Sequence, residues 1–428
     1  MSRKTKTTAT KEVATPALMP KLRFPEFRDA VGWETTPLGE LGAIVTGKTP
    51  STKEDDLWGG EMLFITPTDI TEGEKYQHTT QRTVVETRGT KVLPPGSVVY
   101  TCIASIGKMA LTVVPSVTNQ QINAVVPNGK TAREFIYYSL ANLTPWIKSI
   151  PATSTLPIIN KTQFSGFIIP HPEDKAEQQK IAECLSSVDE LMAAQARKVD
   201  ALKTHKKGLM QQLFPREGET LPRLRFPEFQ NAGEWEMKTM GSIASFSSGG
   251  TPSKDNPEYW NGTIPWVSAS SMYDLVIQKA DHYVTPLAIG NGTRIAKKGS
   301  ILILVRGSML FKRVPICVAG IDVTFNQDVK ALDVDPSINT GFLLYQLSAF
   351  QARFPINETG IGAGKIELEH LKEFELFIPD APEQQRIADC LSSLDALITA
   401  ETQKHEALKT HKKGLMQQLF PSPEEVAV

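Results

Sequence analysis

One segment of this sequence matches a pattern that binds nucleotides. Residues 42–49, GAIVTGKT, satisfy GxxxxGK[ST], in which backbone amides at the start of a helix surround a phosphate. Pro50 and a polar run follow at once, which is a poor beginning for the required helix. A second copy of this region has Ala244 and Gly250 at the positions of the first glycine and the lysine. We therefore expect no nucleotide site here.

Other catalytic patterns are missing from the sequence. It contains no HExxH, no GxSxG and no [ND]PP[FY] tetrapeptide of amino-methyltransferases. The seven histidines are scattered, and the four cysteines form no CxxC pair, which is typical of buried free thiols in a reducing cytosol. No apolar run is long enough to span a membrane, and residues 1–21 lack the apolar core of a signal peptide. We predict a cytoplasmic, non-catalytic protein that itself binds no metal or cofactor.

The elements that would have to position any functional residues are repeated along the chain. The fifteen residues ALKTHKKGLMQQLFP occur at 201–215 and again, unchanged, at 407–421. Upstream, EQQKIAECLSSVDEL at 177 matches EQQRIADCLSSLDAL at 383, and LRFPEF occurs at 22 and at 224. The chain is therefore two units, each a variable block followed by a near-invariant segment.

The near-invariant segments are predicted to be two long helices, each roughly 55 Å long at 1.5 Å per residue. Steps of four and three residues separate the apolar positions, with polar interruptions, as in a coiled-coil seam. The seam comprises Ile181, Leu185, Val188, Met192, Gln195, Val199, Leu202, Lys206, Leu209 and Leu213 in the first helix, and Ile387, Leu391, Leu394, Ile398 and Leu408 in the second. We expect each helix to pack on the other; the alternative is two separate helices, each lying on its own domain.

The variable blocks are predicted to share one mixed α/β fold. Short apolar runs at 97–104, 110–115, 300–305 and 374–379 lie between Gly, Pro and Asn breaks and indicate strands, and short helices are expected at 131–143 and 339–350. Both blocks keep the same skeleton of residues while diverging elsewhere: Trp33 and Trp235, the turns GKTPS at Gly47 and GGTPS at Gly249, Trp58 and Trp260, Asn119-Gln120 and Asn326-Gln327.

The predicted fold class is therefore α+β. It has two mixed α/β domains separated by two long helices, which pack as an antiparallel intramolecular coiled coil with a pseudo-two-fold repeat. The predicted boundaries are a disordered tail at 1–20, a first domain at 21–175, a helix at 176–215, a second domain at 216–381, a helix at 382–421 and a tail at 422–428.

The net charge of −1 argues mildly against a protein that holds nucleic acid alone through bulk electrostatics. Recognition is indicated instead by the architecture. Two diverged domains on antiparallel helices would meet two half-sites of a DNA duplex in opposite orientation. If both domains approach the same side of the duplex, the half-sites are about one helical turn or 34–36 Å apart.

The ordered set of motifs resembles the specificity (S) subunit of Type I restriction–modification systems over almost the whole chain after residue 20. The carriers are LRFPEF with Trp33, the GKTPS and GGTPS turns, the Asn-Gln pairs, and the helices that run from EQQ to HKKGLMQQLFP. The resemblance implies that each domain is a target-recognition domain that reads one half of an asymmetric bipartite DNA site, while the helices set the unread gap. It also implies two modification subunits that carry S-adenosylmethionine and methylate adenine N6, and two restriction subunits that use ATP and Mg²⁺.

Candidate DNA-contacting residues are polar and basic side chains of the diverged loops, which can anchor phosphates or read base edges. In the first domain they are Lys48, Thr49, Ser51, Lys53, Gln81, Arg82, Ser105, Lys108, Thr153 and Ser154. In the second they are Ser253, Lys254, Ser268, Ser270, Arg306, Ser308, Lys312, Arg313 and Lys365.

Candidate partner-binding residues lie in the identical segments, because two copies of one surface suit two copies of one modification subunit. They are His205, Lys206, Lys207, Gln211 and Gln212, and His411, Lys412, Lys413, Gln417 and Gln418. Two alternatives stay open: an enzyme with its own ATPase or methyltransferase activity, and a scaffold whose two domains bind proteins without any DNA sequence preference.

Overall fold

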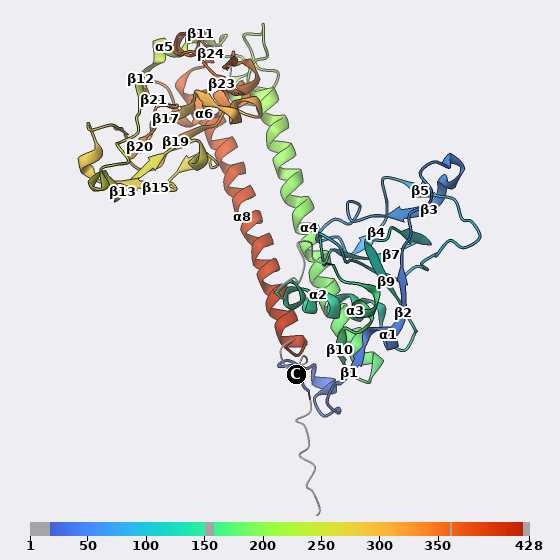
Figure 1. Cartoon of the computed structure of the whole chain (residues 1–428). Helices are drawn as coiled ribbons and strands as arrows, with labels where there is room; N and C mark the ends of the chain where they lie inside the picture. The colour runs from blue at the N-terminus through green and yellow to red at the C-terminus, as the bar shows by residue number, and fades with distance from the viewer. Residues whose placement is uncertain (1–17, 150–157, 360–361, 423–428) are drawn as a thin grey trace, which may run out of the picture. The chain divides into compact units, whose positions relative to one another are not determined.

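The computed structural model of the protein describes residues 18–149, 158–359 and 362–422. The chain forms two compact units: unit 1 is Met1–Gln195 with Lys404–Val428, and unit 2 is Ala196–Gln403 (Figure 1). Each unit contains a head of sheets and short helices and one half of each long helix, α4 (Lys175–Leu213) and α8 (Ala381–Leu419). The tails predicted at 1–20 and 422–428 lie outside the described residues, except for 18–20 and 422.

Head 1, the part of unit 1 outside the long helices, is built on two sheets. A five-stranded sheet has the order β2-β9-β6-β7-β4, a three-stranded sheet has the order β5-β3-β8, and β1 pairs with β10. The strands are β1 (Glu34–Pro37), β2 (Gly42–Thr46), β3 (Trp58–Ile65), β4 (Tyr76–Gln77), β5 (Thr83–Val84), β6 (Val98–Thr101), β7 (Met109–Thr112), β8 (Ser116–Thr118), β9 (Ile122–Pro127) and β10 (Ile168–His171). The helices are α1 (Leu38–Leu41), α2 (Arg133–Ser149) and α3 (Lys161–Ser165), with 3₁₀ turns η1 (Pro25–Phe27) and η2 (Asp55–Leu57).

Head 2, the corresponding part of unit 2, repeats these sheets and adds strands. Its five-stranded sheet has the order β12-β21-β17-β19-β14, a second sheet has the order β15-β13-β20-β16, a third has the order β18-β23-β22, and β11 pairs with β24. The strands are β11 (Glu236–Thr239), β12 (Ala244–Ser248), β13 (Trp260–Val267), β14 (Val276–Ile277), β15 (His282–Val284), β16 (Arg294–Ala296), β17 (Ile301–Leu304), β18 (Arg306–Gly307), β19 (Ile316–Ala319), β20 (Val323–Phe325), β21 (Val329–Val334), β22 (Asn357–Thr359), β23 (Ala363–Lys365) and β24 (Glu375–Ile378). The helices are α5 (Met240–Ile243), α6 (Thr340–Ala349) and α7 (Leu368–Lys372), with 3₁₀ turns η3 (Pro227–Phe229), η4 (Pro257–Tyr259), η5 (Ala269–Ser271), η6 (Pro286–Ala288), η7 (Ser308–Phe311) and η8 (Gln351–Arg353).

The central strand of each large sheet is buried along its whole length. All four residues of β6 and all four of β17 are buried. In β6, Val98 and Tyr100 pack in the cluster that contains α2, while Val99 belongs to a second cluster with Ile122 and Ala124 of β9. A strand with apolar partners on both faces reads as an unbroken apolar run, and these are the runs that predicted strands at 97–104 and 300–305.

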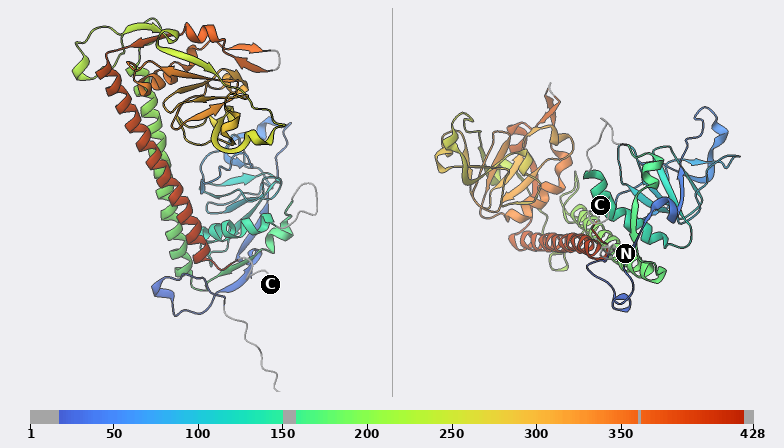
Figure 2. Two further views of the ribbon diagram at one scale, coloured as in Figure 1. Left: turned by 90° about the vertical axis from the view of Figure 1, so that its left-hand side faces the viewer. Right: turned by 60° about the horizontal axis from the view of Figure 1, so that its bottom comes forward.

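The two long helices lie side by side and antiparallel in each unit (Figures 1 and 2). In unit 1, Asp189 of α4 forms an ion pair with Lys412 of α8 at 2.6 Å. In unit 2, Lys206 of α4 pairs with Asp395 of α8 at 2.6 Å. These two pairs are the same pair in the two repeats, so the mixed α/β heads and the antiparallel intramolecular coiled coil are confirmed.

The predicted seam residues of α4 face inward, but the seam is shared between the other long helix and the heads. Ile181 and Leu185 pack in the core of head 1, and Leu213, Ile387 and Leu391 pack in the core of head 2. Six of the seam positions in α4 are buried and the other four are half-buried. The buried ones are Ile181, Leu185, Val188, Gln195, Val199 and Leu213. The contacts between residues group each head with one half of each long helix, which is a different kind of division from the predicted one. The predicted domain boundaries therefore stay a prediction.

Candidate nucleic-acid interface

In head 1 a hydrogen-bonded framework fixes the turn GKTPS. The Lys48 amide donates to the Thr118 carbonyl at 2.9 Å, and the Thr49 hydroxyl donates to Gln120 Oε1 at 2.7 Å. Trp58 Nε1 donates to the Ser51 carbonyl at 3.0 Å. The turn therefore follows strand β2 without a helix, so residues 42–49 lack the strand–loop–helix context of a phosphate-binding loop.

Head 2 reproduces the same contacts around GGTPS. The Gly250 amide donates to the Phe325 carbonyl at 2.9 Å, Thr251 donates to Gln327 at 2.8 Å, and Trp260 Nε1 donates to the Ser253 carbonyl at 2.9 Å. A Cβ at Gly249 would collide with the Phe325 carbonyl oxygen, as one at Gly47 would with that of Thr118. The residues that both heads share in this region therefore hold the GKTPS and GGTPS turns in place.

The asparagines of the two Asn-Gln pairs close a second turn next to the first. Asn119 Oδ1 accepts a hydrogen bond from the Gln121 amide, and Asn326 Oδ1 accepts one from the Asp328 amide, each at 3.1 Å. Both asparagines are buried. The asparagines that both heads keep therefore serve a buried hydrogen-bond network.

In head 1 the candidates after the turn surround a cleft of about 300 Å³. Lys48, Thr49 and Ser51 line the cleft, and two cations that sequence reasoning missed, Arg88 and Lys91, line it as well. These three cations and two hydroxyl groups around one concave surface suit a phosphate oxygen, and Glu54 is the one carboxylate in the lining. Lys53 is exposed on the same loop but does not line the cleft.

The remaining candidates of head 1 lie apart from that cleft. The Arg82 guanidinium stacks on the Trp58 ring, 3.4 Å from its centre, and is held there as an exposed, oriented donor. Gln81 is exposed, whereas Ser105 and Lys108 are half-buried and the Lys108 ammonium donates to the Pro67 carbonyl at 3.3 Å. Thr153 and Ser154 lie outside the described residues.

In head 2 the serine candidates form a hydroxyl cluster. Ser268 and Ser270 lie with their hydroxyls 3.0 Å apart, and Ser270 donates to Asp281 at 2.6 Å. The carboxylate makes this cluster a poor site for phosphate, because like charges repel. Ser253 and Lys254 are exposed on the GGTPS loop, separate from this cluster.

Two of the basic candidates of head 2, Lys312 and Arg313, have exposed aromatic residues nearby. Arg313 donates to the Met272 carbonyl at 2.9 Å and lies 5.9 Å from the centre of the Tyr273 ring. Tyr273 is 68% exposed, and Phe311, which precedes Lys312, is 52% exposed. Large exposed rings beside cations suit stacking on bases or sugars. Sequence reasoning missed both rings because it searched for polar residues alone.

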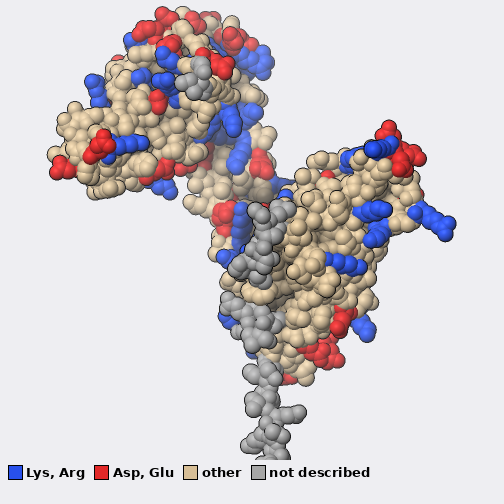
Figure 3. Space-filling view, viewed as in Figure 1, with Lys and Arg blue, Asp and Glu red and all other residues tan. Residues whose placement is uncertain are grey.

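Charge is mixed on the face of both heads that Figure 3 shows. On the face that Figure 3 draws, lysine and arginine side chains lie among aspartate and glutamate side chains. This pattern agrees with the net charge of −1. Any contact of the heads with nucleic acid would therefore depend on local groups of cations such as those at the head 1 cleft.

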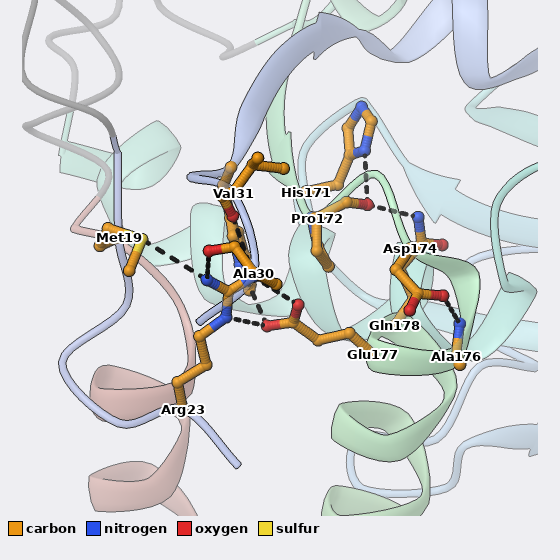
Figure 4. Close-up of polar contacts among 11 residues, drawn as sticks. Met19, Arg23, Ala30, Val31, His171, Pro172, Asp174, Ala176, Glu177 and Gln178 are labelled. Carbon is orange, nitrogen blue, oxygen red and sulfur yellow. Dashed lines mark hydrogen bonds and ion pairs between the residues drawn. The ribbon is translucent and has the colours of Figure 1, made fainter. Parts of the chain in front are cut away.

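An arginine–glutamate pair joins head 1 to the start of α4, and an equivalent pair joins head 2 to the start of α8. In unit 1 the Arg23 guanidinium donates to both carboxylate oxygens of Glu177, at 2.8 and 2.7 Å, and also to the carbonyls of Ala30 and Val31 (Figure 4). The hydrogen bond with Glu177 raises the pKa of Arg23 above its usual value. In unit 2 Arg225 and Glu383 repeat the pair, with two hydrogen bonds of 2.7 Å. This pairing explains why LRFPEF and EQQ both recur.

The glutamine after each glutamate bridges the head to the helix. Gln178 accepts a hydrogen bond from the Ala132 amide and donates to the Pro172 carbonyl, both at 2.9 Å. Gln384 does the same with the Asn339 amide and the Pro379 carbonyl, both at 2.8 Å. The first glutamine of the repeated EQQ motif is therefore structural.

In each head, a tyrosine donates a hydrogen bond to the aspartate of the ion pair that joins the two long helices. The Tyr138 hydroxyl donates to Asp189 at 2.6 Å, and the Tyr345 hydroxyl donates to Asp395 at 2.6 Å. Burial, together with the neighbouring carboxylate, raises the pKa of both tyrosines. Because Lys412 and Lys206 complete these clusters, each cluster ties one head helix, α2 or α6, to both long helices.

The candidate partner-binding residues divide into two sets. Lys206 and Lys412 are occupied by the ion pairs with Asp395 and Asp189. The other eight are exposed on the surface of α4 or α8: His205, Lys207, Gln211, Gln212, His411, Lys413, Gln417 and Gln418. The structure thus assigns part of the identical segment to internal contacts and leaves the rest accessible.

The end of each identical segment belongs to a head core. Leu213 and Phe214 pack with Trp235 and Phe342 of head 2, and Leu419 and Phe420 pack with Trp33 of head 1. Sequence reasoning missed this role because the residues that receive Leu-Phe are far away in the chain.

Among the described residues, no group of three or more His, Cys, Asp or Glu side chains could hold a metal ion. The four cysteines are free, and burial raises the pKa of the Cys102 thiol to about 11 and that of Cys317 to about 12. The Cys102 and Cys317 thiols are therefore poor nucleophiles and poor metal ligands near neutral pH. The described helices include none with the length and apolar character needed to cross a membrane.

Two heads of one fold, with different surfaces and one pair of antiparallel helices, define a duplicated recognition scaffold. A comparison of the sequence with models of known protein families identifies the family of this chain. The model described as the Type I restriction modification DNA specificity domain matches residues 30–204 and again residues 232–410. The chain belongs to this family.

Relatives of this family resemble the chain over 70% of its length or more. The Type I restriction enzyme MjaIX specificity subunit of Methanocaldococcus jannaschii is 23% identical over 403 residues, which cover 90% of this chain and 92% of that protein. The EcoR124I/EcoR124II specificity subunit of Escherichia coli is 28% identical over 70% of this chain and 74% of its own. A crystal structure of the S subunit from M. genitalium superposes with a TM-score of 0.58 at 16% identity, covering 94% of this chain and 99% of that one, and supports the fold.

Proposed function

We propose that this protein is the DNA sequence-specificity subunit of a Type I restriction–modification complex. Each head reads one half of an asymmetric bipartite DNA site, and the antiparallel helices set the gap between the halves. Partner subunits carry out adenine-N6 methylation and restriction at the site that this chain selects.

One observation carries the proposal: two copies of one fold keep their internal framework and change their surface. The turn contacts, the Arg–Glu pairs and the Tyr–Asp–Lys clusters are the same in both units. The exposed residues on the loops differ, as with Lys48 in head 1 and Gly250 in head 2. A shared framework with different surfaces is what two unrelated half-sites require, because base edges are read by side chains and not by the fold.

The proposal assigns catalysis and cofactors to the partners. Two modification subunits would bind S-adenosylmethionine, and two restriction subunits would use ATP and Mg²⁺, in the cytoplasm where the DNA lies. The eight exposed candidates on α4 and α8 form one equivalent surface in each repeat, which suits two copies of the same modification subunit.

The test of this function is a methylome of the host by single-molecule sequencing, with the gene intact, deleted and restored. We expect loss of N6-methyladenine at one split, asymmetric motif on deletion and its return on restoration. If the complex of this chain with the modification subunit methylates no split motif in vitro, the proposed function is wrong. Binding of that complex to DNA without sequence preference would instead favour a scaffold.

The two helix surfaces should each bind one modification subunit. We expect Lys207→Glu with Gln211→Ala, on α4, to weaken one of two equivalent interfaces about 30-fold, since an interface hot spot is worth about 2 kcal/mol or more. Lys413→Glu with Gln417→Ala should do the same on α8. Native mass spectrometry would then give one modification subunit per chain in either variant and none when the variants are combined.

The matched control is Arg197→Glu, an exposed charge reversal on α4 outside the identical segment. It should leave two modification subunits bound. Retention of two subunits by the combined variant would contradict this assignment of the interface.

A further inference from the structure

The two heads place different residues at one equivalent position at the end of their central strands. In head 2, β17 leads through Val305 to Arg306, and Arg306 lies opposite Lys365 of β23 in antiparallel register. In head 1, β6 leads through Cys102 to Ile103, and Ile103 lies opposite Ile158 in an antiparallel bridge. We call these the cross-strand pairs of the two heads.

Backbone hydrogen bonds establish that the two pairs are equivalent. The Val305 amide donates to the Asp328 carbonyl at 2.8 Å, and the Ile366 amide donates to the Val305 carbonyl at 2.9 Å. In head 1 the Cys102 amide donates to the Gln121 carbonyl at 2.8 Å, and the Ile159 amide donates to the Cys102 carbonyl at 2.9 Å. The position is therefore anchored on both sides to a buried strand, which suits a contact that needs accurate placement.

Both pairs are unfavourable when they face water alone. Arg306 is exposed, and Lys365, opposite it, has the same sign of charge; like charges directly opposite on two strands are destabilising. Glu367 pairs with Lys365 at 2.8 Å, but both side chains are more than 40% exposed, so the compensation is weak. In head 1, Ile158 is a large apolar residue that is 53% exposed.

The backbone beside each pair adds a second sign of a functional constraint. Ala104, next to Ile103, has a φ of +61°, which is uncommon for a residue with a Cβ. Its equivalent, Gly307, has a φ of +142°. Such backbone persists where the surrounding structure requires it, and it is concentrated at binding sites.

Base edges would relieve each pair in a different way. Guanine presents two acceptors, O6 and N7, in the major groove, and Arg or Lys is the usual partner for them. Thymine presents a methyl group, and apolar side chains contact it. We propose that the cross-strand pair is a base-reading position of each head, with Arg306 and Lys365 reading guanine in one half-site and Ile103 and Ile158 reading thymine in the other. This inference rests on the proposed function.

The experiment exchanges the pairs in the complex with the modification subunits and reads the methylated motif. We expect Arg306→Ile with Lys365→Ile to relax or change guanine at one place in one half-site, lowering discrimination there about 5- to 150-fold, and to leave the other half-site unchanged. Ile103→Arg with Ile158→Lys should change a thymine position in the other half-site alone. Arg306→Lys keeps the charge but loses the two-pronged donor, so it should weaken guanine preference and retain affinity.

The matched control is Lys297→Ile, which removes a head 2 cation that is 69% exposed and paired with Asp322; it should leave the motif unchanged. Equal weakening on all sequences by the Arg306 and Lys365 exchange would make the pair a phosphate contact and overturn base reading. An unchanged motif in both exchanged complexes would also overturn the inference. Failure of the unmodified complex to methylate any split motif would instead identify the proposed function as the error.

Discussion

Glu177→Ala is expected to lower the free energy of unfolding of unit 1 by about 3–5 kcal/mol, because it leaves a buried guanidinium without its carboxylate. The Arg23 and Glu177 side chains are 6% and 1% exposed, and both donor–acceptor distances are below 3 Å. The desolvation of the Arg23 charge is then no longer compensated. Glu383→Ala should have the same effect on unit 2 through Arg225, whose side chain is 11% exposed.

Hydrogen exchange measures this effect in each unit separately, since the chain need not unfold in one step. Glu177→Ala should lower protection of the amides of β6 and β7 and leave those of β17 and β19 as they are. The matched control is Glu26→Ala, which breaks the exposed 3.4 Å ion pair with Lys180 and should cost less than about 1 kcal/mol. Arg23→Met combined with Glu177→Leu should recover most of the loss. A cost near that of the control would show that the buried pair does not hold the head.

Phe420→Ala should destabilise head 1, at the opposite end of the sequence, by about 3–5 kcal/mol. The Phe420 ring is 2% exposed and lies edge-on to Trp33 and tilted against Phe135, at centroid distances of 6.1 and 5.5 Å. Its removal leaves a cavity in the core that receives the end of α8. Recognition of one half-site should be lost as head 1 loosens.

The repeat supplies the comparison for this variant. Phe214→Ala removes the equivalent ring, which packs 5.6 Å from Phe342, and should loosen head 2 while head 1 keeps its protection. Leu397→Ala, at a 41% exposed apolar position of α8, should change neither head by more than about 0.5 kcal/mol. If Phe420→Ala affected both heads equally, or only α8, the ring would not be an anchor of head 1.

Much of the fold was predictable because its signals are local or repeated. The seam from Ile181 to Leu213 extends over ten positions, and a period sustained for so long has few readings other than a helix that packs along one face. Strands β6 and β17 were also predictable from local sequence, because each is a short run of buried residues that is mostly apolar. Observed helix ends at Leu213 and Leu419 lie within two residues of the predicted ones.

The contacts that join the parts could not be predicted, because they link residues far apart in the chain. Arg23 and Glu177 are 154 positions apart, and nothing near either residue indicates the other. Lys206 was predicted to contact a partner, whereas Asp395 occupies it, 189 positions away. Such pairings depend on the final packing of the heads on the helices.

The candidate DNA surface was predicted only in part, for a different reason. A search for polar and basic side chains finds Arg306 and Lys365. It cannot find Ile103 and Ile158, which become candidates only because they occupy the equivalent cross-strand pair in head 1. The spacing between equivalent residues changes from 203 at Ile103 and Arg306 to 207 at Ile158 and Lys365. Strand register was needed to align them.

The discontinuous make-up of unit 1 has a consequence for synthesis on the ribosome. Trp33 and Phe135 emerge first, but the ring that completes their core, Phe420, follows Phe135 by 285 residues. At roughly 5–20 residues per second, the interval between Phe135 and Phe420 is on the order of 15–60 s, during which head 1 has an open apolar surface. Head 2 has its own ring, Phe214, before any of its strands is synthesised. The head encoded first is therefore the one completed last, and a nascent chain that stops before Leu419 would carry an N-terminal head without its anchor.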